Sequence, residues 1–377
     1  MQPERNTSRR VFLGRAGKGL MAAQFSSALV MRSLAQEIPA PPGKKLGWAI
    51  VGLGRLAMNQ ILPAFATCER SRVVALVSGN PEKARNLALR YGVDPKNIYN
   101  YQNYDTLRSN PEVDVIYIVL PNGMHAEYTI RGAQAGKHIL SEKPMANSAK
   151  DCREMIEACR KAGRKLMVAY RLRYEPYTQA LIKIARDQEL GPLKVVLADA
   201  GFNIGDPSQW RLNKAMAGGG SLMDIGIYAL QAARYISGEE PIEVNAMETT
   251  NRSDPRFKEV EATINFQLRF PSGVLANCTS SYDASLNRFR GVTASGWFEL
   301  EPGLSYTRLR MRLRRGDALE ERDYPQRDHF AAEMDQFSQC IMENRDVLTP
   351  GEEGLRDLQL MTAIYEAAKA GKTIKLT

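Results

Sequence analysis

Residues 46–57 read Leu-Gly-Trp-Ala-Ile-Val-Gly-Leu-Gly-Arg-Leu-Ala, and this stretch decides the fold. Its first six residues form a short apolar run typical of a buried parallel strand, and a helical pattern begins directly afterwards. Gly52 provides the tight turn, Gly54 allows the backbone to approach a pyrophosphate, and Ala57 stands in place of the third glycine of a dinucleotide fingerprint. The predicted anion site at the start of the helix consists of Gly52, Leu53, Gly54, Arg55 and Leu56.

The same rhythm continues through the first half of the chain. Apolar runs at 73–77, 115–120, 138–140 and 166–169 alternate with helical segments. This alternation predicts an α/β fold, in which residues 46–170 form a Rossmann domain with a doubly wound parallel sheet. A chain of 377 residues also exceeds the size of one ordinary core, so a second domain over 171–377 is expected.

Strand-like runs in the second half, at 195–198, 243–248, 262–270 and 274–280, alternate between polar and apolar residues. Helices are expected over 221–237, 328–343 and 351–370, and the last of these carries an apolar stripe at helical spacing. The pattern predicts an α+β domain with a large, mostly antiparallel open sheet. Helices would cover one face, and the other would be available to a second copy of the chain in a homodimer or homotetramer.

The net charge of +9 does not indicate a nucleic-acid partner. Residues 1–35 contribute +5 of it, and the remaining charge is modest for a chain of this size. The one basic run, Arg308, Arg310, Arg312, Arg314 and Arg315, has the spacing of a solvated strand face. The five cysteines and three histidines show no metal-ligand spacing, so no metal site is expected and the cysteines are interpreted as buried thiols.

The first 35 residues are interpreted as a Tat-type signal peptide. Residues 7–13 contain the twin arginines Arg9 and Arg10, a weakly apolar stretch follows to Met31, and cleavage is expected after Ala35. Arg15 and Lys18 interrupt the apolar stretch, which excludes a membrane-spanning helix. We therefore expect export to the periplasm by the Tat machinery, with a proline-containing arm over 36–45; a basic leader without this function is the alternative.

The end of the second predicted strand indicates which dinucleotide binds. An NAD site usually places an acidic residue there, but residues 77–83 read Val-Ser-Gly-Asn-Pro-Glu-Lys. Ser78 can donate a hydrogen bond to a 2′-phosphate and Lys83 can supply positive charge, with Gly79 between them, so NADP is favoured. In the alternative, Lys83 only solvates a helix and Glu82 contacts the ribose.

Ser141-Glu142-Lys143-Pro144 follows one apolar run, and Leu120-Pro121-Asn122 with His125 follows another. These residues resemble the Gfo/Idh/MocA family of oxidoreductases. Within that family, the wording of 77–84, 218–228 and 350–354 is similar to that of the glucose–fructose oxidoreductases. The resemblance implies tightly held NADP, oxidation of one sugar and reduction of another. The arm and the stretch at 203–209 are shorter than in those enzymes, which leaves the identity of the sugars open.

The resemblance also implies roles for individual residues. Lys143 matches the catalytic lysine, Tyr228 matches the catalytic Tyr or His position, and Asp224 is the acidic residue four positions earlier. Ser78, Lys83 and Tyr101 match the residues at the adenosine phosphate end. Further candidates for cofactor contact are Leu120, Pro121, Asn122, His125, Glu142, Arg171, Trp210 and Arg211.

The chemistry of these residue types is consistent with those roles. Oxidation of a sugar at its anomeric carbon requires a base within about 3 Å of the hydroxyl, and the ammonium of Lys143 would favour the phenolate form of Tyr228. Pro144 restricts Lys143 to an extended backbone at the end of a parallel strand. Asp224 and Tyr228 are four residues apart and would share one helix face, although Asp224 could instead be a first-turn helix acid.

Tyr174 is a weaker candidate for contact with the substrate, and Arg171, Trp210 and Arg211 are also weaker because such side chains often serve packing. Two other functions remain open. One is a sugar dehydrogenase whose cofactor dissociates, and the other is a non-catalytic protein that senses NADP or sugar. The joint presence of Lys143 and Tyr228 favours catalysis.

Overall fold

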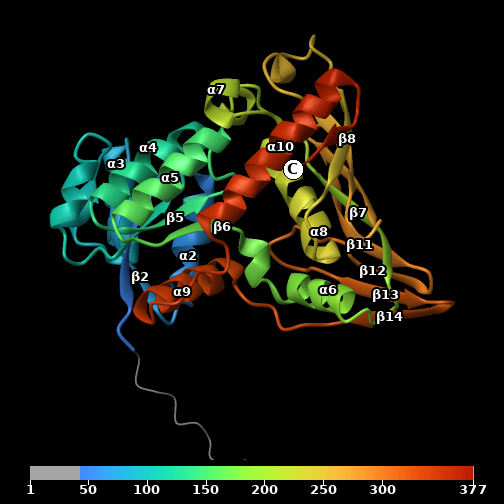
Figure 1. Cartoon of the computed structure of the whole chain (residues 1–377). Helices are drawn as coiled ribbons and strands as arrows, with labels where there is room; N and C mark the ends of the chain where they lie inside the picture. The colour runs from blue at the N-terminus through green and yellow to red at the C-terminus, as the bar shows by residue number, and fades with distance from the viewer. Residues whose placement is uncertain (1–42, 377) are drawn as a thin grey trace, which may run out of the picture. The chain divides into compact units, whose positions relative to one another are not determined.

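The computed structural model describes residues 43–376 (Figure 1). The predicted signal peptide and residues 36–42 of the predicted arm lie outside the described residues. From Lys45 onward the chain forms one compact unit that contains a six-stranded and a nine-stranded sheet. Within the described part, none of the helices combines the length and apolar character needed to cross a membrane.

The first sheet confirms the predicted Rossmann fold. Its strand order is β3-β2-β1-β4-β5-β6, and every pairing is parallel. The strands are β1 (Leu46–Val51), β2 (Ser71–Val77), β3 (Ile98–Tyr99), β4 (Val115–Ile118), β5 (His138–Glu142) and β6 (Leu166–Ala169). The chain reverses its direction of winding between β1 and β4, so a crevice is expected at the carboxyl ends of these strands.

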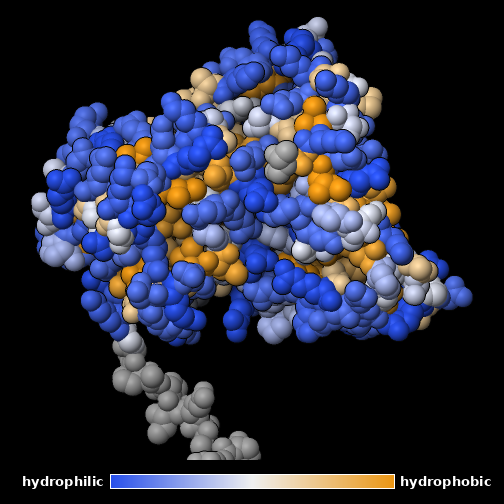
Figure 2. Space-filling view, in the orientation of Figure 1, coloured by the Kyte–Doolittle hydropathy of each residue, from blue (hydrophilic) through white to orange (hydrophobic). Residues whose placement is uncertain are grey.

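Helices flank this sheet as expected for a doubly wound fold. They include α3 (Pro81–Tyr91), α4 (His125–Gln134) and α5 (Ala149–Lys161). In Figure 2 the outward faces of α4 and α5 are mainly hydrophilic, as expected for helices with one face on a sheet and the other in water. The two-residue strand β3 is too short to show a sequence periodicity, and it was therefore not predicted.

The second sheet has the order β14-β13-β12-β11-β7-β10-β9-β8-β15. Among the described strands of this sheet, only β7 and β10 pair in parallel, so the sheet is mostly antiparallel, as predicted. Its strands are β7 (Leu193–Gly201), β8 (Glu243–Thr249), β9 (Thr263–Arg269), β10 (Leu275–Ser281), β11 (Leu286–Thr293), β12 (Gly296–Leu300), β13 (Met311–Arg315), β14 (Ala318–Arg322) and β15 (Ile374–Lys375).

Three helices cover one face of this sheet: α6 (Pro176–Arg186), α8 (Ile227–Ser237) and α10 (Gly351–Ala370) (Figure 1). The alternation in β9 shows the reason, because Ile264, Phe266 and Leu268 are buried beneath the helices while Asn265 and Gln267 are exposed on the other side. The second face carries no helix of the described chain.

The segment that follows β14 packs against the first sheet. Helix α9 (His329–Met342) packs on the Rossmann core, where the indole Nε1 of Trp48 donates a hydrogen bond to Ser338 Oγ over 3.1 Å. The ring of Phe337 meets Trp48 edge-on at 6.0 Å. The two halves are therefore joined by a shared core, a contact that the separate ranges 46–170 and 171–377 do not reveal.

Two smaller expectations concern single residue types. All five cysteines are buried free thiols, as predicted. Within the basic run, Arg314 and Arg315 are exposed on β13, but Arg308 precedes the strand with φ +60°, and Arg312 pairs with the buried carboxylate of Glu299 at 2.6 Å. The run is thus a strand face that is partly neutralised by its own acidic neighbours.

Candidate active site

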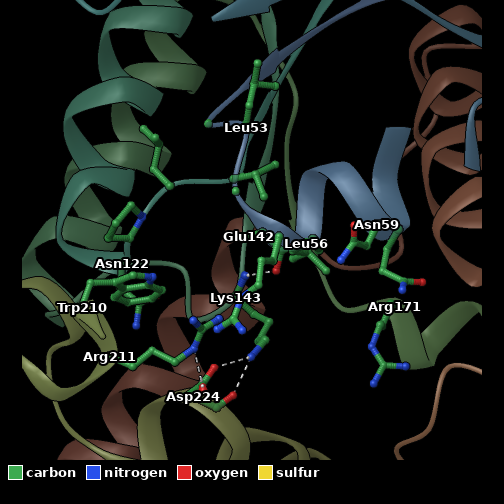
Figure 3. A pocket seen from close by; sticks show the side chains of 18 of the residues that line it. Leu53, Leu56, Asn59, Asn122, Glu142, Lys143, Arg171, Trp210, Arg211 and Asp224 are labelled. Carbon is green, nitrogen blue, oxygen red and sulfur yellow. Dashed lines mark hydrogen bonds and ion pairs between the residues drawn. The ribbon is translucent and has the colours of Figure 1, made fainter. Parts of the chain in front are cut away.

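A cavity of about 840 Å³ opens at the carboxyl edge of the first sheet, where the second half of the chain closes it. Most of the predicted site residues line it (Figure 3). These are Gly52, Leu53, Gly54, Arg55, Leu56, Ser78, Lys83, Tyr101, Leu120, Pro121, Asn122, Glu142, Lys143, Arg171, Trp210, Arg211, Asp224 and Tyr228. Residues from eight separate stretches of sequence therefore meet at one place.

The glycine turn follows β1 and has the geometry that a pyrophosphate needs. Gly52 has φ +94°, and a Cβ there would lie 2.4 Å from the carbonyl oxygen of Val119, so no other residue fits. At Gly54 nothing lies within 4 Å of the place where a Cβ would be, which leaves the backbone open to a ligand. The next turn begins a π-helical segment (Ala57–Ile61). Gly52 and Gly54 are thus suited to hold a dinucleotide, whose phosphates the first N–H groups of the helix would bind.

The adenosine end of the cavity is built around the loop after β2. Ser78 lines the cavity, and its hydroxyl accepts a hydrogen bond from the Asn80 N–H over 3.0 Å. Asn80 caps α3 by accepting from the Lys83 N–H, and the Lys83 ammonium reaches the carbonyl oxygen of Leu53 at 3.4 Å. Glu82 lies exposed in the first turn of α3 and does not line the cavity. A hydroxyl and an ammonium thus face this end of the cavity.

The other end brings the three predicted catalytic residues together. The Lys143 ammonium lies 3.3 Å from Asp224 Oδ1 and also donates to the Asp224 backbone carbonyl (Figure 3). The same ammonium is 4.9 Å from the centroid of the Tyr228 ring. Burial by itself would lower the pKa of Lys143, but the neighbouring Tyr228, Asp224 and Glu142 raise it, so the side chain remains an ammonium.

Asp224 is held as a carboxylate by several donors. Its Oδ2 accepts from Arg211 Nε over 2.9 Å and from the Tyr282 hydroxyl over 3.0 Å. Burial would raise its pKa, but Arg211 and Lys143 outweigh that effect and lower the pKa to about 2. With every oxygen engaged by a donor, Asp224 is suited to orient Lys143 and Arg211, and it is not free to accept a proton from a substrate.

Tyr228 presents its hydroxyl to a second cation. Arg171 Nε donates to that hydroxyl over 3.2 Å, and the guanidinium carbon lies 5.1 Å from the ring centroid. Lys143 and Arg171 therefore both lie near this phenol. This geometry suits a group that must take a proton and give it back.

The structure explains why position 220, within the glycine run 218–220, is a glycine. A Cβ on Gly220 would lie 2.2 Å from the backbone oxygen of Glu261, whose buried carboxylate accepts from the N–H groups of Gly220 (2.8 Å) and Leu222 (2.9 Å). Glu261 thus caps the helix that carries Asp224 and Tyr228. That helix begins as a π-helical turn (Leu222–Gly226) and not as the regular α-helix expected over 221–237. Such turns often occur at functional sites.

The structure corrects three of the predicted positions. The expectation that Tyr174 lines the cleft is wrong, because its hydroxyl points into the core toward Met167 Sδ and Thr349 Oγ1, each at 3.4 Å. His125 is buried outside the cavity, and its two ring nitrogens contact the carbonyl oxygens of Pro144 (2.9 Å) and Leu120 (2.8 Å). It joins the two loops that line the site.

Gly79 also lies outside the cavity lining. A Cβ there would lie 3.1 Å from the ring of Tyr101, so the glycine allows that ring to approach the loop after β2. The residue supports the adenosine end through Tyr101 and makes no direct contribution to the cavity wall.

Several lining residues were not predicted from the sequence. They include Asn59, Gln60, Phe202, Gln209, Ile225, Leu304, Tyr306 and Phe330. Gln209 is the clearest example, because its Oε1 accepts from Arg55 over 3.3 Å and connects the glycine turn with the loop before Trp210. No described group of three or more His, Cys, Asp or Glu side chains is placed to hold a metal ion.

Comparisons with known proteins agree with this geometry. Residues 46–170 match an oxidoreductase family with an NAD-binding Rossmann fold, and residues 178–299 match the GFO/IDH/MocA C-terminal domain. The class of protein is therefore an oxidoreductase with an NAD(P)-binding domain. The chain belongs to the GFO/IDH/MocA family.

Individual relatives cover between 64% and 88% of the chain. The crystal structure of an aldose-aldose oxidoreductase from Caulobacter crescentus is 52% identical, covers 88% of this chain and 100% of that chain, and has a TM-score of 0.87. D-xylose 1-dehydrogenase [NADP(+)] of Haloarcula marismortui is 29% identical over 87% of this chain and 92% of the relative. Trans-1,2-dihydrobenzene-1,2-diol dehydrogenase of Mus musculus is 31% identical over 64% of this chain and 70% of the relative.

Proposed function

We propose that the protein is an NADP-dependent sugar oxidoreductase that oxidises an aldose at C1 to the aldonolactone, retains its NADP, and reduces a second sugar in a manner similar to glucose–fructose oxidoreductase. One observation carries this proposal. Lys143, Asp224 and Tyr228 converge at one end of the cavity whose other end is the glycine turn. The names of the relatives support it, because they include an aldose-aldose oxidoreductase and NADP-dependent D-xylose dehydrogenases.

Three side chains have different roles in the proposed oxidation. The Tyr228 phenolate takes the proton from the C1 hydroxyl, Lys143 donates a hydrogen bond to that oxygen, and Asp224 keeps Lys143 in place. A bound nicotinamide would supply the acceptor for the hydride from C1 and the hydride donor for the second sugar. During reduction of the second sugar, Tyr228 gives the proton back to the new hydroxyl, so protons and hydride balance over the two halves.

The preference for NADP is part of the proposal. It is supported by Ser78 on the cavity wall and by Lys83, whose ammonium lies beside the glycine turn. A carboxylate at this end would repel a 2′-phosphate, and Glu82 faces solvent outside the cavity. NAD with a contact from Glu82 to the ribose is the alternative.

The test uses the protein as purified, without added cofactor. An aldose should raise the near-ultraviolet absorbance of the reduced nicotinamide, and a second sugar should reverse the rise. A rise that requires added NADP and is not reversed by any sugar would identify a dehydrogenase with a dissociable cofactor and overturn the proposed retention. No change with any aldose, with or without NADP, would contradict the proposal and favour a sensing role.

Replacement of Lys143 tests the site itself. Lys143→Met should abolish hydride transfer and leave NADP bound, because Arg211 and Tyr282 still satisfy Asp224. Lys161→Met is a matched control, since Lys161 lies on the exposed side of α5 and pairs with Glu157. Retained activity in the Lys143 variant, or loss of its cofactor, would contradict the assignment.

We also propose that the protein is a homodimer or homotetramer that assembles through the face of the second sheet that carries no helix of the described chain. Met247 and Leu275 are 77% and 43% exposed on strands of this sheet. Native mass spectrometry reports subunit count and bound nucleotide together. A monomer at micromolar concentration would contradict this assembly.

Export to the periplasm by the Tat route is proposed from the twin arginines alone. Replacement of both Arg9 and Arg10 by lysine should retain the protein inside the cytoplasm, as measured by fractionation. If the doubly substituted protein is exported as well as the original, the leader has another function.

A further inference from the structure

The guanidinium of Arg171 contacts three different groups. Nε donates to the Tyr228 hydroxyl over 3.2 Å, Nη2 donates to the carbonyl oxygen of Leu304 over 2.6 Å, and Nη1 lies 3.3 Å from Nδ1 of His329. The side chain is buried, with 6% of its surface exposed. The contact between Arg171 and Tyr228 therefore depends on what holds the other side of the guanidinium.

His329 is the first residue of α9, and the cap of this helix holds its backbone in place. The carboxylate of Asp328 caps the helix by accepting from the N–H groups of Phe330 (3.0 Å) and Ala331 (3.1 Å). The His329 side chain is buried against the ring of Tyr306, whose centroid is 6.0 Å away. Its Nε2 has no hydrogen-bond partner among the described residues.

The tautomer of His329 follows from its partner. A guanidinium has donors only, so Nδ1 must be the acceptor and the proton of the neutral ring must be on Nε2. Burial and the charge of Arg171 agree with this, because together they lower the pKa of His329 to about 3. The ring is thus a neutral acceptor aimed at Arg171.

Among the described residues, no carboxylate accepts a hydrogen bond from Arg171. Glu333 lies one turn after His329 on α9, is buried, and has no hydrogen-bond partner among the described residues on either oxygen. Burial and the nearby Glu142 raise its pKa well above the usual value, and these effects outweigh the opposing charge of Arg171. Glu142 is itself engaged by the Tyr117 hydroxyl at 2.8 Å and the Lys143 N–H at 3.1 Å.

We propose that His329 is a positioning residue of the active site, which accepts a hydrogen bond from Arg171 and thereby keeps the guanidinium on the Tyr228 hydroxyl. This inference rests on the proposed function, in which Tyr228 exchanges the proton of the sugar hydroxyl. Arg171 orients the phenol oxygen and supports its negative charge, so an error in its placement slows proton transfer. His329 lies outside all the stretches that the sequence analysis connected with the site.

A pair of variants separates this role from simple packing. His329→Leu removes the acceptor, and we expect kcat to fall about 10-fold to 100-fold with little change in the KM for the sugar. His329→Asn keeps an acceptor oxygen near the place of Nδ1 and should recover most of that loss. Equal losses in both variants, or full activity in His329→Leu with its fold intact by melting temperature, would overturn the proposal.

Coupling with Arg171 gives the second readout. If His329 acts through Arg171, the loss in the double variant Arg171→Leu/His329→Leu should be no greater than that in Arg171→Leu alone. Losses that multiply would show that His329 acts independently and would overturn the proposal.

The third readout does not require catalysis. The chain has only three histidines, so ¹⁵N labelling of histidine resolves the ring nitrogens of His329. We expect a neutral ring protonated on Nε2 from pH 5 to 8, and a changed tautomer or titration in Arg171→Leu. A His329 ring that is protonated on Nδ1, or charged at pH 6, would overturn the proposal even if the protein oxidises sugars. If the protein oxidises no sugar but His329 shows the expected tautomer, only the proposed function is contradicted.

Discussion

Asp224→Asn is the substitution for which the structure makes the sharpest prediction. The carboxylate is the counter-ion of two cations, with Lys143 at 3.3 Å and Arg211 at 2.9 Å, and its side chain is only 16% exposed. The amide has nearly the same shape but no charge. The variant therefore leaves two partly buried cations without their anion. Removing one partner of a buried ion pair lowers the free energy of unfolding more than replacing the whole network by apolar groups does.

The size of the effect follows from the carboxyl pKa. Folding lowers it from 3.8 to about 2, which corresponds to about 2 kcal/mol of stability. Because the pKa is lowered in the folded state, this stability is present above about pH 4 and is lost as the pH falls through about 2. We expect the variant to lose about 2–4 kcal/mol of unfolding free energy at pH 7, with a smaller difference from the original protein near pH 3.

The assay combines urea unfolding at several pH values with sugar-dependent reduction of the nicotinamide. Without Asp224 to orient Lys143, kcat/KM should fall about 100-fold or more. Asp283→Asn is the matched control, because Asp283 is 51% exposed and pairs with Arg256 at 3.0 Å. If Asp224→Asn is no less stable than this control and retains its activity, Asp224 is not the counter-ion that holds Lys143 in place.

Two further substitutions test other parts of the site. Ser78→Asp places a carboxylate at the adenosine end, so the ratio of the dissociation constants for NADP and NAD should shift toward NAD; an unchanged affinity for NADP would show that Ser78 lies away from the 2′-phosphate. Glu333→Gln removes a buried acid whose pKa is raised in the folded state. Above about pH 4.5 the unfolded chain ionises Glu333, whereas the raised pKa keeps it protonated in the folded chain to a higher pH. The variant should therefore gain up to about 1.4 kcal/mol relative to the original protein for each pH unit between these two pKa values. A difference in unfolding free energy that does not vary with pH would contradict this reasoning.

The sequence by itself determined the elements whose signal is local. Residues 46–57 contain a strand, a turn and the start of a helix in one continuous stretch, so the Rossmann fold and the position of Gly52 could be predicted. The run 141–144 likewise places Lys143 at the end of a strand. Chain connectivity holds such neighbours together, and the pattern of residue types is sufficient to recognise them.

Only the tertiary structure decided which distant side chains meet. Tyr174 and Arg171 belong to the same short segment, yet Arg171 reaches Tyr228, 57 residues away, while Tyr174 turns into the core. The partner of Arg171 on its other side, His329, is 158 residues away in a helix that returns to the first sheet. Such contacts depend on the path of the chain and on the packing of whole elements, and neither leaves a periodic signal in the sequence around these residues.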